Sequence, residues 1–172
     1  MSELLWELTR STGLVSLLLL TVAVVLGTTA GWGSPTARAA RQGVHRWAAG
    51  LSVGLLLVHV VTAVADSYVD LSVTDALVPF AAGYRPLAVG LGTVASDLLL
   101  AVLLTSVARA RLRGPGWRRV HVLAYAAWPL AVLHALGAGS DVHTTTVRAV
   151  TAGCGTAVIC VLAARLARGW ST

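Results

Sequence analysis

HRWAAGLSVGLLLVH at residues 45–59 and HVLAYAAWPLAVLH at residues 121–134 are the two stretches that decide the fold. Each stretch begins and ends with a histidine, and Arg46 is the single Lys, Arg, Asp or Glu in either of them. An ionisable side chain inside an apolar span is costly in hydrocarbon and therefore marks a candidate functional site. Thirteen residues separate the two histidines of the first stretch and twelve separate those of the second, so the four form a matched set.

The composition is that of a membrane protein. The chain has 172 residues, of which 56% are hydrophobic and only 12% are charged, and its mean hydropathy is +0.78. Soluble domains carry about 25% charged residues. Five apolar stretches approach the roughly 20 residues that a helix needs to cross a bilayer. The sequence therefore predicts an all-α integral membrane helical bundle with five transmembrane helices in a single domain, residues 1–172. The expected spans are residues 12–30, 44–65, 86–108, 120–138 and 144–166.

The arginines predict the orientation of the bundle. All 13 basic residues are arginines; ten fall on one side of the predicted spans, and three fall on the other side together with most of the acidic residues. Cytoplasmic loops are enriched in arginine, so we expect the N-terminus outside and the C-terminus in the cytoplasm. Their position at the ends of apolar spans also argues against a nucleic-acid surface. The cytoplasmic set is Arg38, Arg41, Arg46, Arg109, Arg111, Arg113, Arg118, Arg119, Arg165 and Arg168, and the outer set is Arg10, Arg85 and Arg148.

Depth in the membrane pairs the histidines across two spans. The two spans run in the same direction, so His45 and His121 lie near the cytoplasmic face and His59 and His134 near the outer face. At 1.5 Å per residue the two levels are about 20 Å apart. Iron in haem takes axial imidazole ligands, and we expect one haem at each level. Zinc or copper is a weaker alternative because its ligands must converge on one point, and hydrogen bonding between helices is the structural alternative.

The directions of the side chains test this arrangement. On an ideal helix His59 returns to within about 40° of His45, whereas His134 lies about 140° from His121. Pro129 lies between the latter two and lacks a backbone donor. We therefore expect a kink or a tightened turn at residues 125–129, with Trp128 turned toward the space between the haems.

These residues resemble the ferric reductase-like transmembrane domain, which is shared by NADPH oxidases, yeast ferric reductases and the bacterial haem subunit of the methionine sulfoxide reductase system. The resemblance rests on the histidine spacing and on the short motifs around it. The motifs are His45-Arg46, Gly50 and His59 in one helix and Trp117-Arg118-Arg119-Val120-His121, Tyr125, Trp128-Pro129 and His134 in another. Trp6, Arg10, Thr12-Gly13 and Gly139-Ser140-Asp141 resemble small bacterial members.

The resemblance implies a b-type cytochrome of the bacterial inner membrane that passes electrons across the bilayer through two non-covalent, bis-histidine b-type haems. Many relatives have six helices, whereas five are predicted here. The oxidases and yeast reductases also carry a fused FAD/NADPH domain without a counterpart in these residues. No flavin or NADPH site is expected, so a flavoprotein, an FMN protein or a quinone would donate the electrons. The chain would be an electron-transfer component of an oxidoreductase, without a catalytic residue and with a periplasmic protein as a candidate acceptor.

Five other side chains are candidates for contact with the haems. Arginine pairs with carboxylates, so Arg46, Arg118 and Arg119 are placed to meet the propionates of the inner haem, although the orientation rule also accounts for them. Arg10 lies on the outer side against that rule, and we expect it to meet a propionate of the outer haem. Trp128 lies at mid-membrane depth, where it either sits between the haems or packs within the bundle.

The sequence also gives expectations for side chains outside the two histidine pairs, and it allows two alternative functions. Asp97 is expected to face the bundle interior and find a partner there, and His143 to lie on the surface of an outer loop. The outer aspartates could attract ferric ions, or cap helices and solvate loops. Cys154 and Cys160 are expected to be packing residues. The rival functions are a haem-binding membrane subunit of a periplasmic reductase system and a haem-free structural or transport protein.

Overall fold

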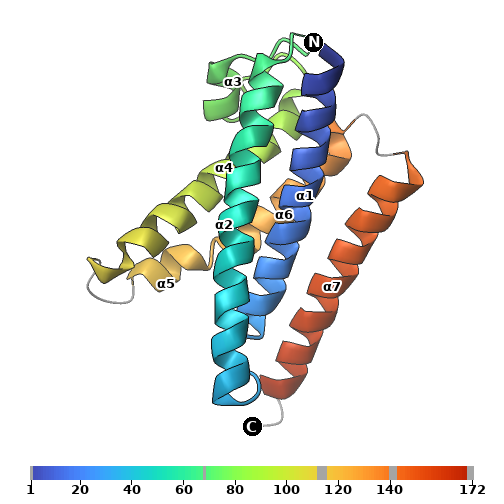
Figure 1. Ribbon diagram of the computed structural model, residues 1–172. Helices are drawn as coiled ribbons and strands as arrows, with labels where there is room; N and C mark the ends of the chain where they lie inside the picture. Colours follow the sequence, from blue (N-terminus) through green and yellow to red (C-terminus); the bar gives the residue numbers. More distant parts are fainter. Residues whose placement is uncertain (1, 68, 112–115, 140–142, 170–172) are drawn as a thin grey trace.

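Five long helices dominate the computed structural model, which describes residues 2–67, 69–111, 116–139 and 143–169 (Figure 1). The long helices are α1 (Ser2–Thr28), α2 (Pro35–Ala65), α4 (Pro86–Val107), α6 (Ala124–Ala138) and α7 (Thr145–Gly169). The shorter elements are α3 (Val73–Leu77), the 3₁₀ turn η1 (Ala108–Ala110) and α5 (Gly116–His121). The start of α1 and the end of α7 lie at opposite ends of the bundle, as an odd number of spans requires.

The all-helical fold with five membrane-length helices is confirmed. The segments long and apolar enough to cross a bilayer are Glu3–Thr28, Pro35–Ala65, Pro86–Ala110, Gly116–Ala138 and Thr145–Gly169. Each of them matches one predicted span, although α1 and α2 begin earlier than predicted, at Ser2 and Pro35. Large apolar side chains such as Leu57 and Ile159 are exposed on the outside of the helices, where a bilayer would cover them.

An antiparallel hairpin of α1 and α2 forms the frame of the bundle. Ser34 caps the start of α2 with its side chain, and Pro35 occupies the first turn, where its missing N–H costs no hydrogen bond. Arg41 closes the connection by donating to the carbonyl oxygens of Thr29 at 2.7 Å and Trp32 at 2.6 Å. These contacts fix the register in which α2 packs antiparallel to α1.

The seam of this hairpin is polar at its centre. Ser16 Oγ donates to the Ser52 carbonyl oxygen, and Ser52 Oγ donates to the Ser16 carbonyl oxygen, each at 2.9 Å. Ser52 is only 1% exposed. Small hydroxylated residues let two helices approach closely in lipid and hydrogen-bond across the contact. The reciprocal pair therefore locks α1 and α2 together midway between their ends.

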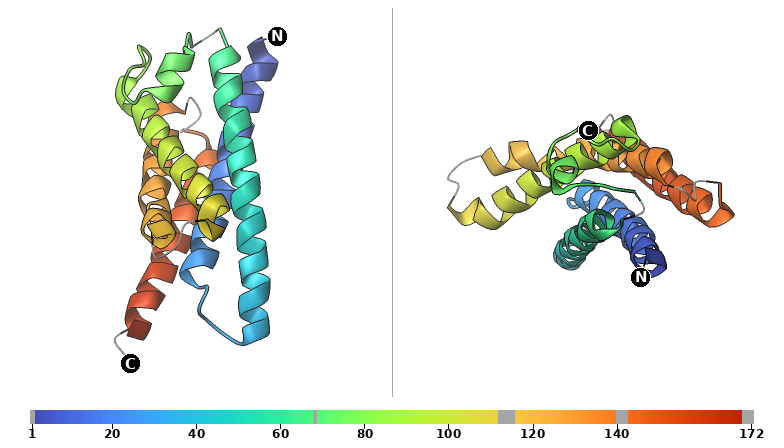
Figure 2. Two further views of the ribbon diagram at one scale, coloured as in Figure 1. Left: turned by 90° about the vertical axis from the view of Figure 1, so that its left-hand side faces the viewer. Right: turned by 90° about the horizontal axis from the view of Figure 1, so that it is seen from above.

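The remaining long helices form a row behind the hairpin (Figure 2). α6 packs along α4, and α7 packs along α1. A cluster of buried side chains joins α1 to this row; its members are Leu20, Val24, Leu99, Ala127 and Val158. In the described chain, α2 packs extensively against α1 alone and makes no contact of similar extent with α4, α5 or α6. α2 thus stands apart from the helices that carry the other two histidines.

The fourth span is interrupted, as predicted, but the break lies earlier than expected. Residues 122 and 123 separate α5 from α6. Backbone hydrogen bonds there reach back three residues instead of four, from the Leu123 N–H to the Val120 carbonyl at 2.9 Å and from the Tyr125 N–H to the Val122 carbonyl at 3.0 Å. Such bonds tighten the backbone relative to an α-helix. α6 then continues through Pro129, so the proline is not where the span breaks.

Asp97 is exposed on α4, so the prediction that it faces the bundle interior is wrong. Ala95 and Leu99, two residues to either side, are buried. Two residues correspond to about 200° around an α-helix. The inward face of α4 is therefore occupied by these apolar side chains, and Asp97 lies on the opposite face.

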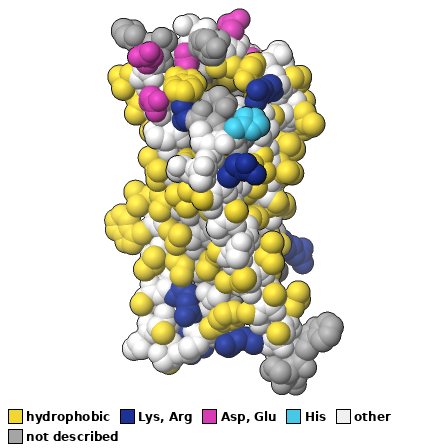
Figure 3. All heavy atoms as spheres, turned by 90° about the vertical axis from the view of Figure 1, so that its right-hand side faces the viewer, with side chains coloured by type: hydrophobic (Ala, Val, Ile, Leu, Met, Phe, Trp, Pro, Cys, Tyr) yellow, Lys and Arg dark blue, Asp and Glu magenta, His cyan; other side chains and the backbone are white. Residues whose placement is uncertain are grey.

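Acidic side chains gather at the end of the molecule where α1 begins (Figure 3). Asp75 completes a capping box at the start of α3, where Ser72 is the N-cap residue. The Asp75 carboxylate accepts from the Ser72 N–H at 2.8 Å, and Ser72 Oγ accepts from the Asp75 N–H at 3.2 Å. Asp66 is buried at the end of α2. The helix-capping role expected for outer aspartates is confirmed for Asp75. Arg113, Ser140 and Asp141 lie outside the described residues.

Candidate functional site: two facing histidine pairs

The structure brings together the histidines that the sequence pairs by depth. The ring centroids of His45 and His121 are 6.1 Å apart, with the ring planes inclined at 62°. The ring centroids of His59 and His134 are also 6.1 Å apart, with the planes at 84°. In each pair one ring comes from α2 and the other from the α5–α6 span. The side chains of two helices that barely touch thus meet across a gap at two levels.

Each ring is held through its Nδ1 atom. In three of the rings Nδ1 donates to a backbone carbonyl oxygen: His59 to Thr9 at 2.7 Å, His45 to Ala23 at 2.8 Å and His134 to Ala88 at 2.8 Å. A carbonyl oxygen can only accept, so Nδ1 carries the proton in these rings. His121 differs, because its Nδ1 lies 3.3 Å from the hydroxyl of Ser106 on α4.

The other ring nitrogen, Nε2, is left free for a ligand. Within the described residues, Nε2 has no hydrogen-bond partner in any of the four rings. No buried side-chain nitrogen or oxygen in the same part of the chain lacks a partner, so these Nε2 atoms border open space. When Nδ1 holds the proton, Nε2 keeps the lone pair that binds a metal. Each pair therefore offers two imidazole nitrogens.

The spacing of the rings fits one metal ion per pair. A metal lies about 2.0–2.1 Å from an imidazole nitrogen, which is itself about 1.1 Å from the ring centre, so two opposed ligands place their centres about 6.2–6.4 Å apart. The observed 6.1 Å is slightly shorter than this in both pairs. Among the described residues there is no group of three or more His, Cys, Asp or Glu side chains that could hold a metal ion. The arrangement suits a metal whose other ligands come from a planar cofactor, as in haem.

The backbone sets the depth and direction of the rings. α2 is one continuous helix, so the 14-residue step from His45 to His59 rises about 21 Å and turns the side chain by about 40° relative to the first. His121 ends α5, and His134 lies on α6 beyond the tightened turn. That turn accounts for how both rings meet α2, although an ideal helix would point them apart.

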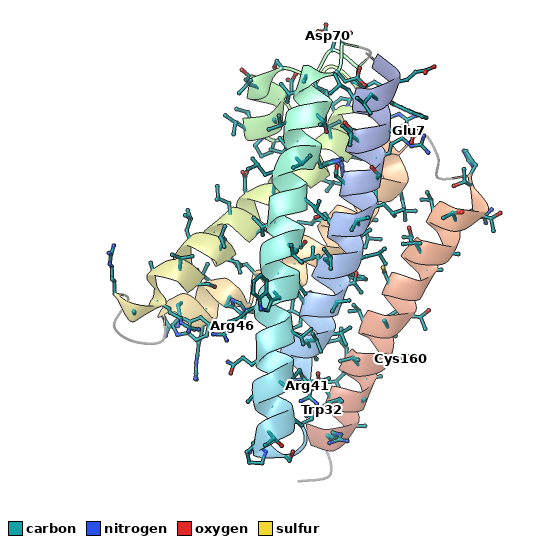
Figure 4. All side chains as sticks on the ribbon, viewed as in Figure 1. Glu7, Trp32, Arg41, Arg46, Asp70 and Cys160 are labelled. Atoms are coloured by element: carbon teal, nitrogen blue, oxygen red, sulfur yellow. The ribbon has the colours of Figure 1, made fainter. Side chains whose placement is uncertain are left out.

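The structure places three of the arginines that the sequence associates with propionates. Arg46 is exposed on α2, further along that helix than Arg41 (Figure 4). The guanidinium of Arg10 lies 3.9 Å from the ring centroid of Trp6, and Arg10 Nη1 is 3.8 Å from the carboxylate of Glu7. Arg118 lines an open pocket of about 660 Å³ at the arginine-rich end. Propionate binding by Arg10 and Arg46 stays a prediction.

Trp128 is engaged within the bundle. Its Nε1–H donates to Thr21 Oγ1 on α1 at 2.9 Å, and its ring packs against the buried cluster that joins α1 to α4, α6 and α7. This contact agrees with the packing alternative for Trp128, while a place between the haems stays a prediction. His143 is exposed and belongs to neither pair. Cys154 is buried, Cys160 is exposed, and both are free thiols.

Sequence reasoning missed the partners of the Nδ1 atoms. Three of them are main-chain carbonyls, and because every residue has one, the sequence does not show which of them accepts the bond. The fourth is the side chain of Ser106. One signal was available: Gly13 and Gly27 are 14 residues apart on α1, the same step as from His45 to His59 on the antiparallel α2. Because the helices of a hairpin keep a constant register, this pair of glycines could have identified α1 as the helix that lies against both rings.

The geometry first defines a class: a five-helix membrane bundle with two imidazole pairs at two depths. Comparison with models of known protein families then identifies the family. The model of the ferric reductase-like transmembrane component matches residues 12–132, and the chain belongs to this family. The match includes three of the four paired histidines and ends two residues before His134. Neither a curated protein nor a solved structure gives a significant match.

Proposed function

We propose that the protein is a membrane b-type cytochrome that carries electrons across the bilayer through two bis-histidine haems. His45 and His121 would hold the haem near the arginine-rich end, and His59 and His134 the haem near the acidic end. The observation that carries the proposal is the pair of facing rings at each level, 6.1 Å between centroids, with every Nδ1 engaged and every Nε2 free among the described residues.

The four histidines would determine what kind of redox chemistry is accessible. A bound haem supplies a reversible one-electron change at its iron. Imidazoles from two helices would hold each haem, His45 and His121 one of them and His59 and His134 the other. The protein would contribute ligation, spacing and control of the reduction potential.

The electron donor and acceptor would be separate partners. A flavoprotein, an FMN protein or a quinone would donate, and ferric ion or a periplasmic protein would accept. We place the chain in the inner membrane of a bacterium, with its N-terminus outside and its arginine-rich end in the cytoplasm, because arginine is enriched in cytoplasmic loops. The family supports ferric reduction as the reaction class only by analogy.

The haem content of the purified chain tests the proposal. A pyridine haemochrome assay on protein in mild detergent should give two b-type haems per chain, and dithionite should reduce both. His59→Ala and His134→Ala should each remove one haem and leave the other. His143→Ala is the matched control, since His143 is exposed and belongs to neither pair, and it should keep both. A monodisperse wild-type chain with one haem or none would overturn the proposal.

A further inference from the structure

Three of the four paired histidines rest in the same local structure on a neighbouring helix. Each donates from Nδ1 to a carbonyl oxygen, and a glycine follows the carbonyl residue four positions later. The carbonyl, glycine and histidine are Thr9, Gly13 and His59; Ala23, Gly27 and His45; and Ala88, Gly92 and His134. The first two lie on α1 and the third on α4, so the arrangement arises on two separate helices.

The glycines lie directly against the imidazole rings. A Cβ atom on Gly92 would stand 2.5 Å from His134 Nδ1, and one on Gly13 would stand 2.7 Å from His59 Nδ1. A Cβ atom on Gly27 would come 3.3 Å from His45 Cε1. A side chain at the first two positions would overlap the ring, and at the third it would press on it.

Helix geometry explains the four-residue spacing. Cα–Cβ bonds tilt toward the start of a helix, so the side chain of a residue covers the turn before it. A side chain at the fourth position after a carbonyl therefore shields that carbonyl from a neighbouring helix. Glycine removes the shield, and the carbonyl, which already accepts within its own helix, can accept a second hydrogen bond through its other lone pair.

We propose that Gly13, Gly27 and Gly92 are positioning residues that open backbone sockets for the ligand histidines. The term socket means the carbonyl together with the glycine four residues later. Each socket fixes the rotation of its imidazole and keeps the proton on Nδ1, so that Nε2 presents its lone pair across the gap. Outer-shell partners of this kind orient metal-binding histidines and tune the metal.

The fourth histidine supplies an internal contrast. His121 lies opposite Ser106, at 3.3 Å, and none of the glycines in the described residues is crowded by its ring. Its ring instead makes an edge contact with Trp117, with centroids 5.5 Å apart. The level of His59 and His134 thus has two sockets, and the level of His45 and His121 has one.

The inference rests on the proposed function and is tested by adding a single methyl group. In Gly92→Ala and Gly13→Ala, we expect the haem held by His59 and His134 to be lost, or its low-spin EPR signal and midpoint potential to shift. The signal of the other haem should stay unchanged. Gly27→Ala should change only the haem held by His45 and His121, and by less, because the added atom would be further from the ring.

Two control variants separate the sockets from general crowding. Gly90 lies on the same helix as Gly92, and Gly90→Ala places a methyl group against the ring of Phe80. Gly54 lies on α2, and the methyl group of Gly54→Ala meets no atom within 4 Å. Both should keep the two haem signals of the wild type. If Gly92→Ala does not yield monodisperse protein, Gly13→Ala and Gly27→Ala decide the question.

The outcomes distinguish the two proposals. A wild-type chain without two haems would refute the proposed function. A wild-type chain with two haems whose EPR signals and potentials persist in Gly13→Ala, Gly27→Ala and Gly92→Ala would refute the sockets alone. Equal disturbance of the His59 and His134 haem by Gly90→Ala and Gly92→Ala would also refute them.

Discussion

Replacing Ser106 with alanine should selectively weaken the haem held by His45 and His121. Among the described residues, Ser106 is the one side-chain partner of a ligand Nδ1, and its 3.3 Å contact with His121 is longer than the 2.7–2.8 Å bonds of the other three rings. A hydrogen bond contributes about 0.5–1.5 kcal/mol net, and a long one belongs at the lower end. A loss of about 0.5–1 kcal/mol corresponds to roughly two- to fivefold weaker binding.

Haem transfer to an excess of an apo-globin measures this effect. The two haems are followed by their absorbance and are assigned to the two levels by EPR of samples taken during the transfer. In the wild type, we expect the haem of His45 and His121 to leave first, and in Ser106→Ala to leave about two to five times faster still. The haem of His59 and His134 should leave at the wild-type rate.

Thr105→Val is the matched control for Ser106→Ala. It removes the hydroxyl of the adjacent residue, whose bonds to the carbonyls of Ala101 and Val102 stay within α4. This variant should release both haems like the wild type. If Ser106→Ala behaves like the wild type, or if Thr105→Val matches Ser106→Ala, then the hydroxyl of Ser106 does not position His121.

Two further predictions concern the frame and the orientation. Ser52→Ala removes one of the two reciprocal 2.9 Å bonds of the α1–α2 seam and should lower the free energy of unfolding in mixed micelles by about 0.6–1.7 kcal/mol. Ser11→Ala should cost less, because within the described residues the Ser11 hydroxyl bonds only to carbonyls of α1 itself. An equal loss in the two variants would show that the bond across the seam adds nothing to stability. For the orientation, a C-terminal alkaline phosphatase fusion should be inactive and a C-terminal fluorescent protein bright, because ten arginines lie on that side; the reverse pattern would invert the bundle.

Hydropathy was enough to predict the five spans, because the cost of exposing apolar side chains or unpaired backbone in lipid leaves few alternatives. It did not predict where α1 and α2 begin. Those helices extend beyond the apolar stretches to Ser2 and Pro35, and at Pro35 the start is set by local capping from Ser34 rather than by burial. Hydropathy detects the part of a helix that lipid would cover, and capping residues determine where the helix starts.

The histidine pairs were predictable from spacing, whereas the way they are held was not. Matching depths on two parallel spans leave little choice of partner, and the structure places the rings accordingly. Asp97 shows the limit of such reasoning: the cost of a carboxylate in lipid favours an inward position, but the rotation of α4 is set by Ala95 and Leu99. The break at residues 122–123 depends likewise on packing, which a single proline did not reveal.

The division of ligands between two helical units has a consequence for biogenesis. The α1–α2 hairpin is synthesised first and contains one histidine of each pair with both of their sockets; the α4–α6 segment follows and brings the two opposing rings. With the proposed haems bound, each pair of coordinating histidines would link α2, an early part of the chain, to the later α5–α6 span. The buried cluster joins α1 to the later helices without any cofactor, whereas α2 makes few contacts of its own with them. Cofactor supply during translation would therefore govern how firmly α2 docks, while membrane insertion of the spans would proceed without it.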